Sequence, residues 1–208
     1  MLMNFLISLV MDLVVVMYSQ IVNNIRLWEA IASNSIRPGQ RVVDCTVGNG
    51  NDTIMLAELV GEKGKVYGFD IQKEALDITA RKLDLRNLGG QVNLILDGHE
   101  NIDKYIGEEV DFIVYNLGYL PKGDKAIKTK KTTTIISLQK SLGLLKENGI
   151  LVLTSYTGHQ GGLDEKKAVE EYLEALDQRL FNVLKYEFLN QKNSPPILYA
   201  VEKSKMRR

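Results

Sequence analysis

Short apolar runs alternate with longer amphipathic segments along most of the chain. The early runs are continuously apolar, as expected for parallel strands covered on both faces. Strand-like runs lie at 41–45, 65–69, 92–96, 110–115, 149–156, 181–189 and 197–202. Helix-like segments lie at 25–36, 52–60, 72–87, 99–106, 132–146 and 164–179. Turn pairs such as Pro38-Gly39 and Gly89-Gly90 separate them.

Regular alternation of strand and helix predicts a doubly wound α/β fold. The last two strands are the exception, because the segment 190–196 between them is rich in turn residues. We expect these two strands to form an antiparallel hairpin beside five parallel strands. The prediction is a Rossmann-like, mostly parallel sheet of seven strands, in one domain that spans residues 24–208.

The first 23 residues form an apolar extension before this domain. Residues 1–18 lack the basic start and the small-residue cleavage site of a signal peptide. They are barely long enough for a membrane helix, and Asn4, Ser8 and Asp12 interrupt them. We expect a helix that packs on the domain or on the partner of a homodimer, in preference to membrane attachment. A misassigned start codon is the third explanation.

Composition and charge exclude few function classes. The chain has 208 residues, with 26 basic and 26 acidic side chains and no net charge. Only a local cluster could therefore indicate a nucleic-acid partner. Cys45 is the single cysteine, which excludes an internal disulfide and a multi-cysteine zinc site. We expect a cytoplasmic protein without a metal.

A glycine-rich turn follows the first strand, in the stretch VVDCTVGNGNDT at 42–53. Ligands of open α/β sheets lie beyond the carboxyl ends of the strands, where Gly48 and Gly50 would let the backbone approach one. The stretch is neither a Walker loop nor a complete dinucleotide pattern. Asp44 and Asp52 would repel a pyrophosphate and suit a ligand with an amine and a sulfonium. A tight turn before a capped helix is the structural alternative.

The second and third strands end in polar residues at the same edge. Asp70 follows the glycines at about the distance where an acidic side chain accepts both ribose hydroxyls. His99 falls where an adenine could lie, or stands beside the cap of the next helix. Together with the glycine-rich turn, Asp70 favours a cofactor that carries a ribose.

The fourth strand ends in NLGY, at residues 116–119. This segment resembles the Asn-Pro-Pro-Tyr corner of amine methyltransferases. In such a corner, the Asn oxygen and a backbone carbonyl accept the hydrogens of a neutral amine and direct its lone pair at the methyl. We therefore expect Asn116 to orient the amine and Tyr119 to pack against a flat base. A plain strand-ending turn would require neither residue.

Seven motifs, in this order, resemble the MnmM (YtqB-like) family, often called putative rRNA methylases: DCTVGNGNDT, FDIQ, DGH, NLGYLPKGDK, TTTI, GHQGG and NQKNSPP. The resemblance covers about residues 24–203. It implies a class I S-adenosylmethionine-dependent methyltransferase. It also implies the substrate, the aminomethyl group on the wobble uridine of tRNA, which becomes 5-methylaminomethyl-uridine and is often 2-thiolated.

The resemblance also implies the residues that contact S-adenosylmethionine. By position these are Asp44, Thr46, Gly48, Asn49, Gly50, Asn51, Asp52, Thr53, Asp70, Ile71, Gln72, Gly98, His99, Asn116, Leu117 and Gly118. The chain departs from the family pattern at Cys45 and Val47. Asn23-Asn24 stands where some relatives are expected to have a histidine.

Two further features complete the expected site. A basic segment after the fourth strand would hold phosphates of the tRNA anticodon region, unless it is a solvated loop; it comprises Lys122, Lys125, Lys128, Lys130 and Lys131. His159, which follows the fifth strand, is a candidate to accept the proton that the amine loses. Contact with a phosphate and capping of a turn are its alternatives.

Other functions remain open from the residues alone. The chain could methylate rRNA or another amine, or it could bind a nucleotide without catalysis. Asn116 argues against a pure binding module, which needs no amine acceptor at the methyl. The missing third glycine and the acidic turn argue against an NAD-dependent oxidoreductase.

Overall fold

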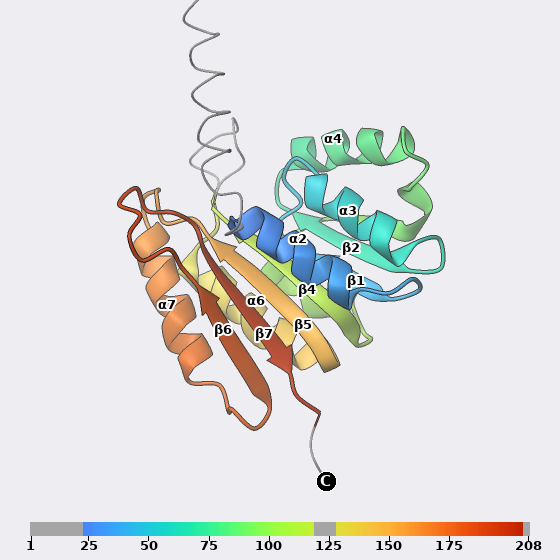
Figure 1. The fold of residues 1–208 in the computed structure, drawn as a ribbon. Helices are drawn as coiled ribbons and strands as arrows, with labels where there is room; N and C mark the ends of the chain where they lie inside the picture. Colours follow the sequence, from blue (N-terminus) through green and yellow to red (C-terminus); the bar gives the residue numbers. More distant parts are fainter. Residues whose placement is uncertain (1–22, 119–127, 206–208) are drawn as a thin grey trace, which may run out of the picture.

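The computed structural model describes residues 23–118 and 128–205, which contain a seven-stranded sheet in the order β3-β2-β1-β4-β5-β7-β6 (Figure 1). The strands are β1 (Arg41–Asp44), β2 (Lys65–Asp70), β3 (Val92–Leu96), β4 (Val110–Leu117), β5 (Leu145–Ser155), β6 (Phe181–Tyr186) and β7 (Ile197–Lys203). The first five are parallel, and β7 runs antiparallel between β5 and β6. The predicted mostly parallel sheet with its terminal hairpin is confirmed.

Helices cover both faces of the sheet and enclose two apolar cores. One core packs α2, α3 and α4 on the sheet, and the other packs α5, α6 and α7 on the opposite face. The helices are α2 (Asn24–Ser35), α3 (Asn51–Val60), α4 (Lys73–Asp84), α5 (Ile102–Tyr105), α6 (Lys131–Leu144) and α7 (Gly162–Glu174). Short 3-10 turns, η1 (Gly89–Gln91) and η2 (His99–Asn101), flank β3.

Several predicted boundaries are wrong by about a turn. The expected helix at 99–106 is the 3-10 turn η2 followed by the single turn of α5. The helix expected at 164–179 ends at Glu174, and the strand expected at 181–189 ends at Tyr186. The fifth strand begins at Leu145 rather than at 149, because Leu145 already pairs with Val110 before an irregularity in the register.

The fourth strand is longer than predicted, and this decides the direction of Asn116. Asn116 and Leu117 both continue the ladder with β5, where Asn116 pairs with Thr154. Side chains alternate across a strand, so Asn116 lies on the face of Val114, where α2 and α3 pack. Tyr115 lies on the opposite face, and its hydroxyl bonds Ser137 and Ser141 of α6 at 2.6 and 2.7 Å.

Helix α2 lies along one face of the sheet, with its N-terminal end at the carboxyl ends of the strands and its C-terminal end leading to the start of β1 (Figure 1). Asn23 caps it by accepting a hydrogen bond from the backbone N–H of Arg26, at 2.9 Å. Trp28 on its inner face is buried in the core. The expected N-terminal helix at 1–18 lies outside the described residues. No helix in 23–118 or 128–205 is long and apolar enough to cross a membrane.

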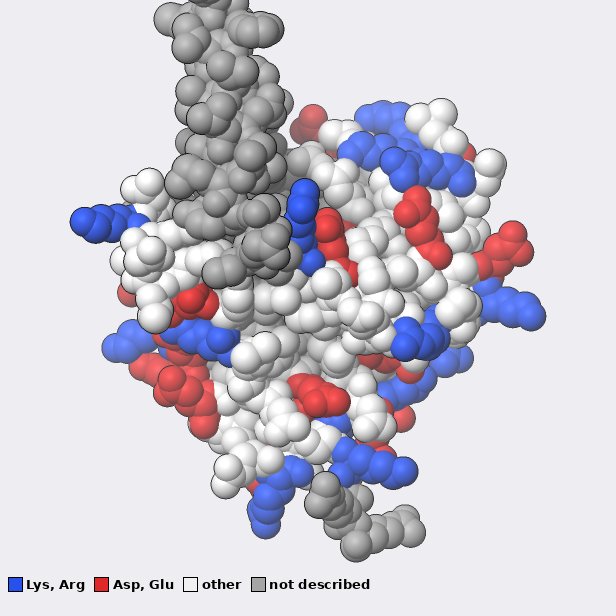
Figure 2. Space-filling model, viewed as in Figure 1, with Lys and Arg blue, Asp and Glu red and all other residues white. Residues whose placement is uncertain are grey.

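The surface that carries α2 has no dominant charge. Figure 2 shows basic and acidic side chains intermixed around a largely uncharged centre. Several basic side chains gather at the upper right of this view, over α4.

Candidate active site

A cavity of about 940 Å³ opens at the carboxyl ends of β1, β2, β3, β4 and β5. This is the edge at which open α/β sheets bind their ligands. Its lining includes the turn after β1, the ends of β2, β3 and β4, the segments 128–133 and 156–159, and one face of α2. Most of the sequence-predicted residues therefore lie around one space.

Two glycines shape the turn after β1. Gly48 and Gly50 both have positive φ angles, 51° and 77°, which L side chains rarely adopt. At Gly50 a Cβ atom would also collide with the side chain of Thr79 on α4. The turn is tied to β4, because the backbone N–H of Asn116 donates to the hydroxyl of Thr46 at 2.7 Å.

Two of the predicted cofactor contacts lie beneath this turn. Asp44 is fully buried. Its carboxylate accepts hydrogen bonds from the backbone N–H of Thr46 at 3.0 Å and from the hydroxyl of Thr53 at 2.6 Å. Burial raises the pKa of Asp44 to about 6, against the lowering by these bonds. Asp44, Thr53 and Gly50 do not line the cavity. Asp44 and Thr53 support the turn from behind, whereas Gly50 is part of the turn itself.

Asp70 is placed at the rim of the cavity by the end of β2. One carboxylate oxygen accepts from the N–H of Gly48 and the other from the N–H of Gln72, each at 2.8 Å. These bonds join the first and second strand ends. A carboxylate offers about four lone-pair sites, so both oxygens can still accept a ligand hydroxyl.

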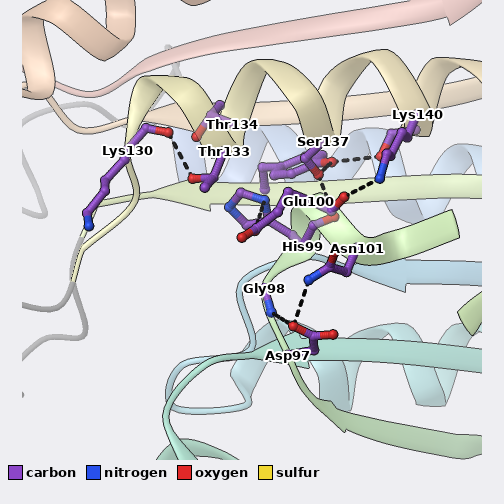
Figure 3. A network of polar contacts seen from close by, with 12 residues as sticks. Asp97, Gly98, His99, Glu100, Asn101, Lys130, Thr133, Thr134, Ser137 and Lys140 are labelled. Carbon is purple, nitrogen blue, oxygen red and sulfur yellow. Dashed lines mark hydrogen bonds and ion pairs between the residues drawn. The ribbon is translucent and has the colours of Figure 1, made fainter. Parts of the chain in front are cut away.

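The end of β3 is locked against α6 by a polar network (Figure 3). Asp97 accepts from the N–H of Gly98 at 2.7 Å and from the side-chain amide of Asn101 at 2.8 Å. Ser137 donates to the backbone oxygen of His99 at 2.9 Å. His99 lines the cavity, and its buried Nδ1 has no hydrogen-bond partner within the described residues. Burial lowers the pKa of His99 to about 4, so its ring is neutral at pH 7.

At the end of β4, the side chain of Asn116 meets Asp52 in the first turn of α3. The amide nitrogen of Asn116 donates to Oδ2 of Asp52, and both residues line the cavity. Burial, and then the charges of Asp44 and Glu29, raise the pKa of Asp52 to about 7. The carboxylates are thus crowded at this end.

Several hydrogen bonds hold the segment 128–134 at the cavity. The N–H of Thr129 donates to the backbone oxygen of Gly118 at 2.9 Å. Thr129 and Thr134 both donate to the buried carboxylate of Glu165 on α7, at 2.8 and 2.6 Å. Lys128 donates to the backbone oxygen of Gln160 at 2.8 Å. These bonds fix one wall of the mouth.

The remaining predicted residues divide into placed and undescribed ones. His159 lies over Gly118, where a Cβ would approach its Nε2 to 3.8 Å, and it lines the cavity. Leu117 lines it too, with its side chain in the core. Lys130 lines the mouth and is exposed, as is Lys131 beside it. Tyr119, Lys122 and Lys125 lie outside the described residues.

Sequence reasoning missed the contribution of α2. Ile25, Trp28 and Glu29 line the cavity, and the charge of Glu29 raises the pKa of Asp52. The helix itself was predicted, but nothing in the spacing of its residues indicates that its N-terminal end lies at this edge of the sheet. A buried tryptophan beside an acidic residue is equally typical of an ordinary core helix.

Comparisons with known proteins agree with this geometry. A family model described as "Putative rRNA methylase" matches residues 66–202. A tRNA (mnm(5)s(2)U34)-methyltransferase of Arabidopsis thaliana chloroplasts is 33% identical over 188 residues, which cover 85% of this chain and 67% of that protein. A putative rRNA-methylase of Clostridium thermocellum is 46% identical, with a TM-score of 0.87 over 88% of this chain and 99% of that chain.

A second solved structure bears on the cofactor. A putative methyltransferase of Streptococcus mutans, in complex with SAH, is 39% identical, with a TM-score of 0.81 over 88% of this chain and 99% of that chain. SAH, S-adenosylhomocysteine, is the product that S-adenosylmethionine leaves after methyl transfer.

The residues around the cavity fit S-adenosylmethionine. Asp70 offers acceptors for ribose hydroxyls. His99 at the end of β3 lines the cavity, and its Nδ1 makes no hydrogen bond within the described residues and lies 3.8 Å from Oε2 of Glu100. Asp52 and Asp70 line the cavity beside the turn after β1, and their carboxylates suit a cationic ligand. On these grounds together, the chain belongs to this rRNA methylase family and is an S-adenosylmethionine-dependent methyltransferase.

Proposed function

We propose that the protein methylates the primary amine of a 5-aminomethyl group on the wobble uridine of tRNA. The chloroplast relative, a tRNA (mnm(5)s(2)U34)-methyltransferase, supports the choice of substrate. The alternative, methylation of rRNA, is favoured by the description of the family.

The choice of an amine as the group that receives the methyl rests on the hydrogen-bond acceptors at the end of β4. The backbone oxygens of Leu117 and Gly118 already accept from the N–H groups of Tyr156 and Thr129, at 3.2 and 2.9 Å. Asn116 uses its amide nitrogen toward Asp52, and no described donor bonds its side-chain oxygen. That oxygen has no hydrogen-bond partner among the described residues, and the backbone oxygens of Leu117 and Gly118 each keep a second lone pair, so the end of β4 can accept the hydrogens of a nucleophilic amine.

The residues of the chain orient the amine rather than activate it covalently. S-adenosylmethionine, when bound, supplies an electrophilic methyl group on a sulfonium. The oxygen of Asn116 accepts one amine hydrogen, which sets the direction of the lone pair and stabilises the positive charge that grows on nitrogen. His159, over Gly118, is the proposed acceptor of the proton that the ammonium form must lose.

The RNA would enter over the wall made by segment 128–134. Lys130 and Lys131 are exposed there and can contact phosphates, while Thr129 and Thr134 hold the wall on α7. The wobble base would have to leave its stack to reach a cavity at the strand ends.

Nucleoside mass spectrometry on tRNA tests the substrate. A strain without the gene should accumulate 5-aminomethyl-uridine species, and the wild-type gene should remove them. An Asn116→Ala copy should not. Unchanged wobble nucleosides, with methyl transfer from purified enzyme to rRNA instead, would overturn the tRNA proposal in favour of rRNA.

A further inference from the structure

Asp52 and Asn116 are brought together by two elements that sequence patterns do not connect. Asp52 lies in the first turn of α3, and Asn116 lies in the β4 ladder, with its backbone N–H bonded to Thr46. The position of Asn116 is therefore fixed by the sheet. The contact between the two side chains then decides how the amide group is turned about its last bond.

An ionised carboxylate can only accept hydrogen bonds. Facing one, an amide must present its nitrogen and turn its oxygen away. Asp52 in its charged form therefore admits one of the two amide orientations of Asn116. A neutral carboxylic acid also carries a donor, so it can bond the amide oxygen instead and permits both orientations.

The surroundings of Asp52 bring its carboxylate close to the change between the charged and the neutral form. Asp44 from β1 and Glu29 from α2 add negative charge, and Tyr156 after β5 lies near enough that Asp52 raises its pKa. No described lysine or arginine forms an ion pair with Asp52 or Glu29. The nearby cation of α4, Lys82, donates to the backbone oxygen of Asn49 and the side chain of Asn51.

We propose that Asp52 is a positioning residue for methyl transfer. Its carboxylate holds the side-chain amide of Asn116 so that the amide oxygen faces the amine that receives the methyl group. The proposal rests on the proposed function, because it takes the amine as the group that Asn116 receives. It moves Asp52 from the cofactor contacts expected from the family resemblance to the reacting end of the cavity.

Three variants separate this role from a structural one. Asp52→Asn keeps the shape but adds a donor that can bond the oxygen of Asn116. Asp52→Glu keeps an acceptor-only carboxylate. Glu74→Gln is the matched control, because Glu74 is an exposed acidic residue in the first turn of the next helix, α4, and lies outside the cavity. It controls for the loss of a negative charge at a helix N-terminus.

Two measurements are independent of turnover. Calorimetry gives the affinity of each variant for S-adenosylhomocysteine, which we expect to stay within about threefold of wild type. NMR follows the side-chain amide of Asn116, assigned with Asn116→Ala. We expect its signals to shift between pH 6 and 8 in the wild type and to lose that titration in Asp52→Asn, because the group that titrates there is removed.

Turnover on tRNA that carries 5-aminomethyl-uridine completes the test. We expect kcat at saturating cofactor to fall about 10-fold or more in Asp52→Asn, to recover in part in Asp52→Glu, and to remain unchanged in Glu74→Gln. A loss of S-adenosylhomocysteine affinity with unchanged kcat would overturn the proposal and return Asp52 to the cofactor.

Failure of the proposed function has a different signature. A wild-type enzyme that does not methylate this tRNA, while it binds S-adenosylhomocysteine normally, would overturn the substrate and the positioning role with it. A wild-type enzyme that is active, beside an Asp52→Asn variant with full kcat, would overturn the positioning role alone.

Discussion

The two ends of the cavity use carboxylates in opposite ways. At the end of the cavity beside Asp70, where we expect the ribose (the ribose end), both oxygens of Asp70 accept backbone N–H groups, at 2.8 Å each, and these bonds counter the rise in pKa that burial causes. At the end beside Asn116, where we propose that methyl transfer takes place (the reacting end), Asp52 lies near the charges of Asp44 and Glu29, and a single amide lowers its pKa against burial and like charge. The first arrangement builds a fixed binding surface. The second holds a charge in an unfavourable place, as sites that carry out chemistry often do.

Removing the amide of Asn116 should impair methyl transfer at the reacting end and leave cofactor binding at the ribose end unchanged. In Asn116→Ala we expect kcat to fall by about 100-fold or more, since one preorganised hydrogen-bonding group contributes that much in other enzymes. The affinity for S-adenosylhomocysteine should stay close to wild type. Steady-state kinetics and calorimetry on one preparation check both. Equal losses in kcat and in affinity would show that the two ends are not separable.

A substitution of Asp70 should have the opposite effect and weaken binding of the cofactor while kcat changes little. In Asp70→Asn we expect S-adenosylhomocysteine to bind about 10- to 100-fold more weakly, because charge-assisted bonds to hydroxyls are lost. At saturating cofactor, kcat should change far less. The control is Asp77→Asn, since Asp77 lies on the exposed side of α4 and pairs with Lys73. Unchanged binding in Asp70→Asn would remove Asp70 from the cofactor site.

The contrast also predicts how stability depends on pH. Because the folded pKa of Asp52 is raised from 3.8 to about 7, the folded state binds more protons than the unfolded state between these values. The free energy of unfolding should therefore fall as pH rises from about 4 to about 7. Asp52→Asn should remove part of this fall and be more stable than wild type at pH 8 by about 1–2 kcal/mol.

Denaturant titrations at pH 5 and pH 8 measure this difference. Asp44 and Asp70 also have raised pKa values, so part of the pH dependence should persist in the variant. A variant that is less stable than wild type at pH 8 would mean that the charge of Asp52 supports the start of α3 more than it strains the site. A gain in stability with a loss in kcat would fit the contrast between the two ends.

The sheet could be predicted from sequence because continuous apolar runs and turn residues are local signals. The same signals placed Asp70 and Asn116 at the strand ends, since strand ends of a parallel sheet meet at one edge. The predicted strand nevertheless stopped at Tyr115. Asn and Gly are poor strand formers, and it is the pairing with Thr154 that draws Asn116 into the ladder.

Contacts between distant elements could not be predicted in this way. The sequence assigns Asp44 and Asp52 the same role, because both are acidic residues beside one glycine-rich turn. In the structure Asp44 supports the turn through Thr53, and Asp52 meets Asn116. Glu29 entered no sequence argument, because its effect depends on the path of α2 across the sheet. Such differences arise from tertiary packing and leave no periodic trace in the chain.

The smallest expected effect concerns the mouth of the cavity, outside both ends. Lys130 is exposed at the mouth, whereas Lys63 is exposed in the turn before β2, at the opposite edge of the sheet. Lys130→Ala should weaken tRNA binding a few-fold and lower the slope of log affinity against log salt by about 1, as expected when one phosphate contact is lost. Lys63→Ala should change neither. Filter binding across a salt series, with kcat measured at saturating tRNA, separates this contact from both ends of the cavity. A fall in kcat in Lys130→Ala would instead connect the mouth to the reacting end through Thr129 and Gly118.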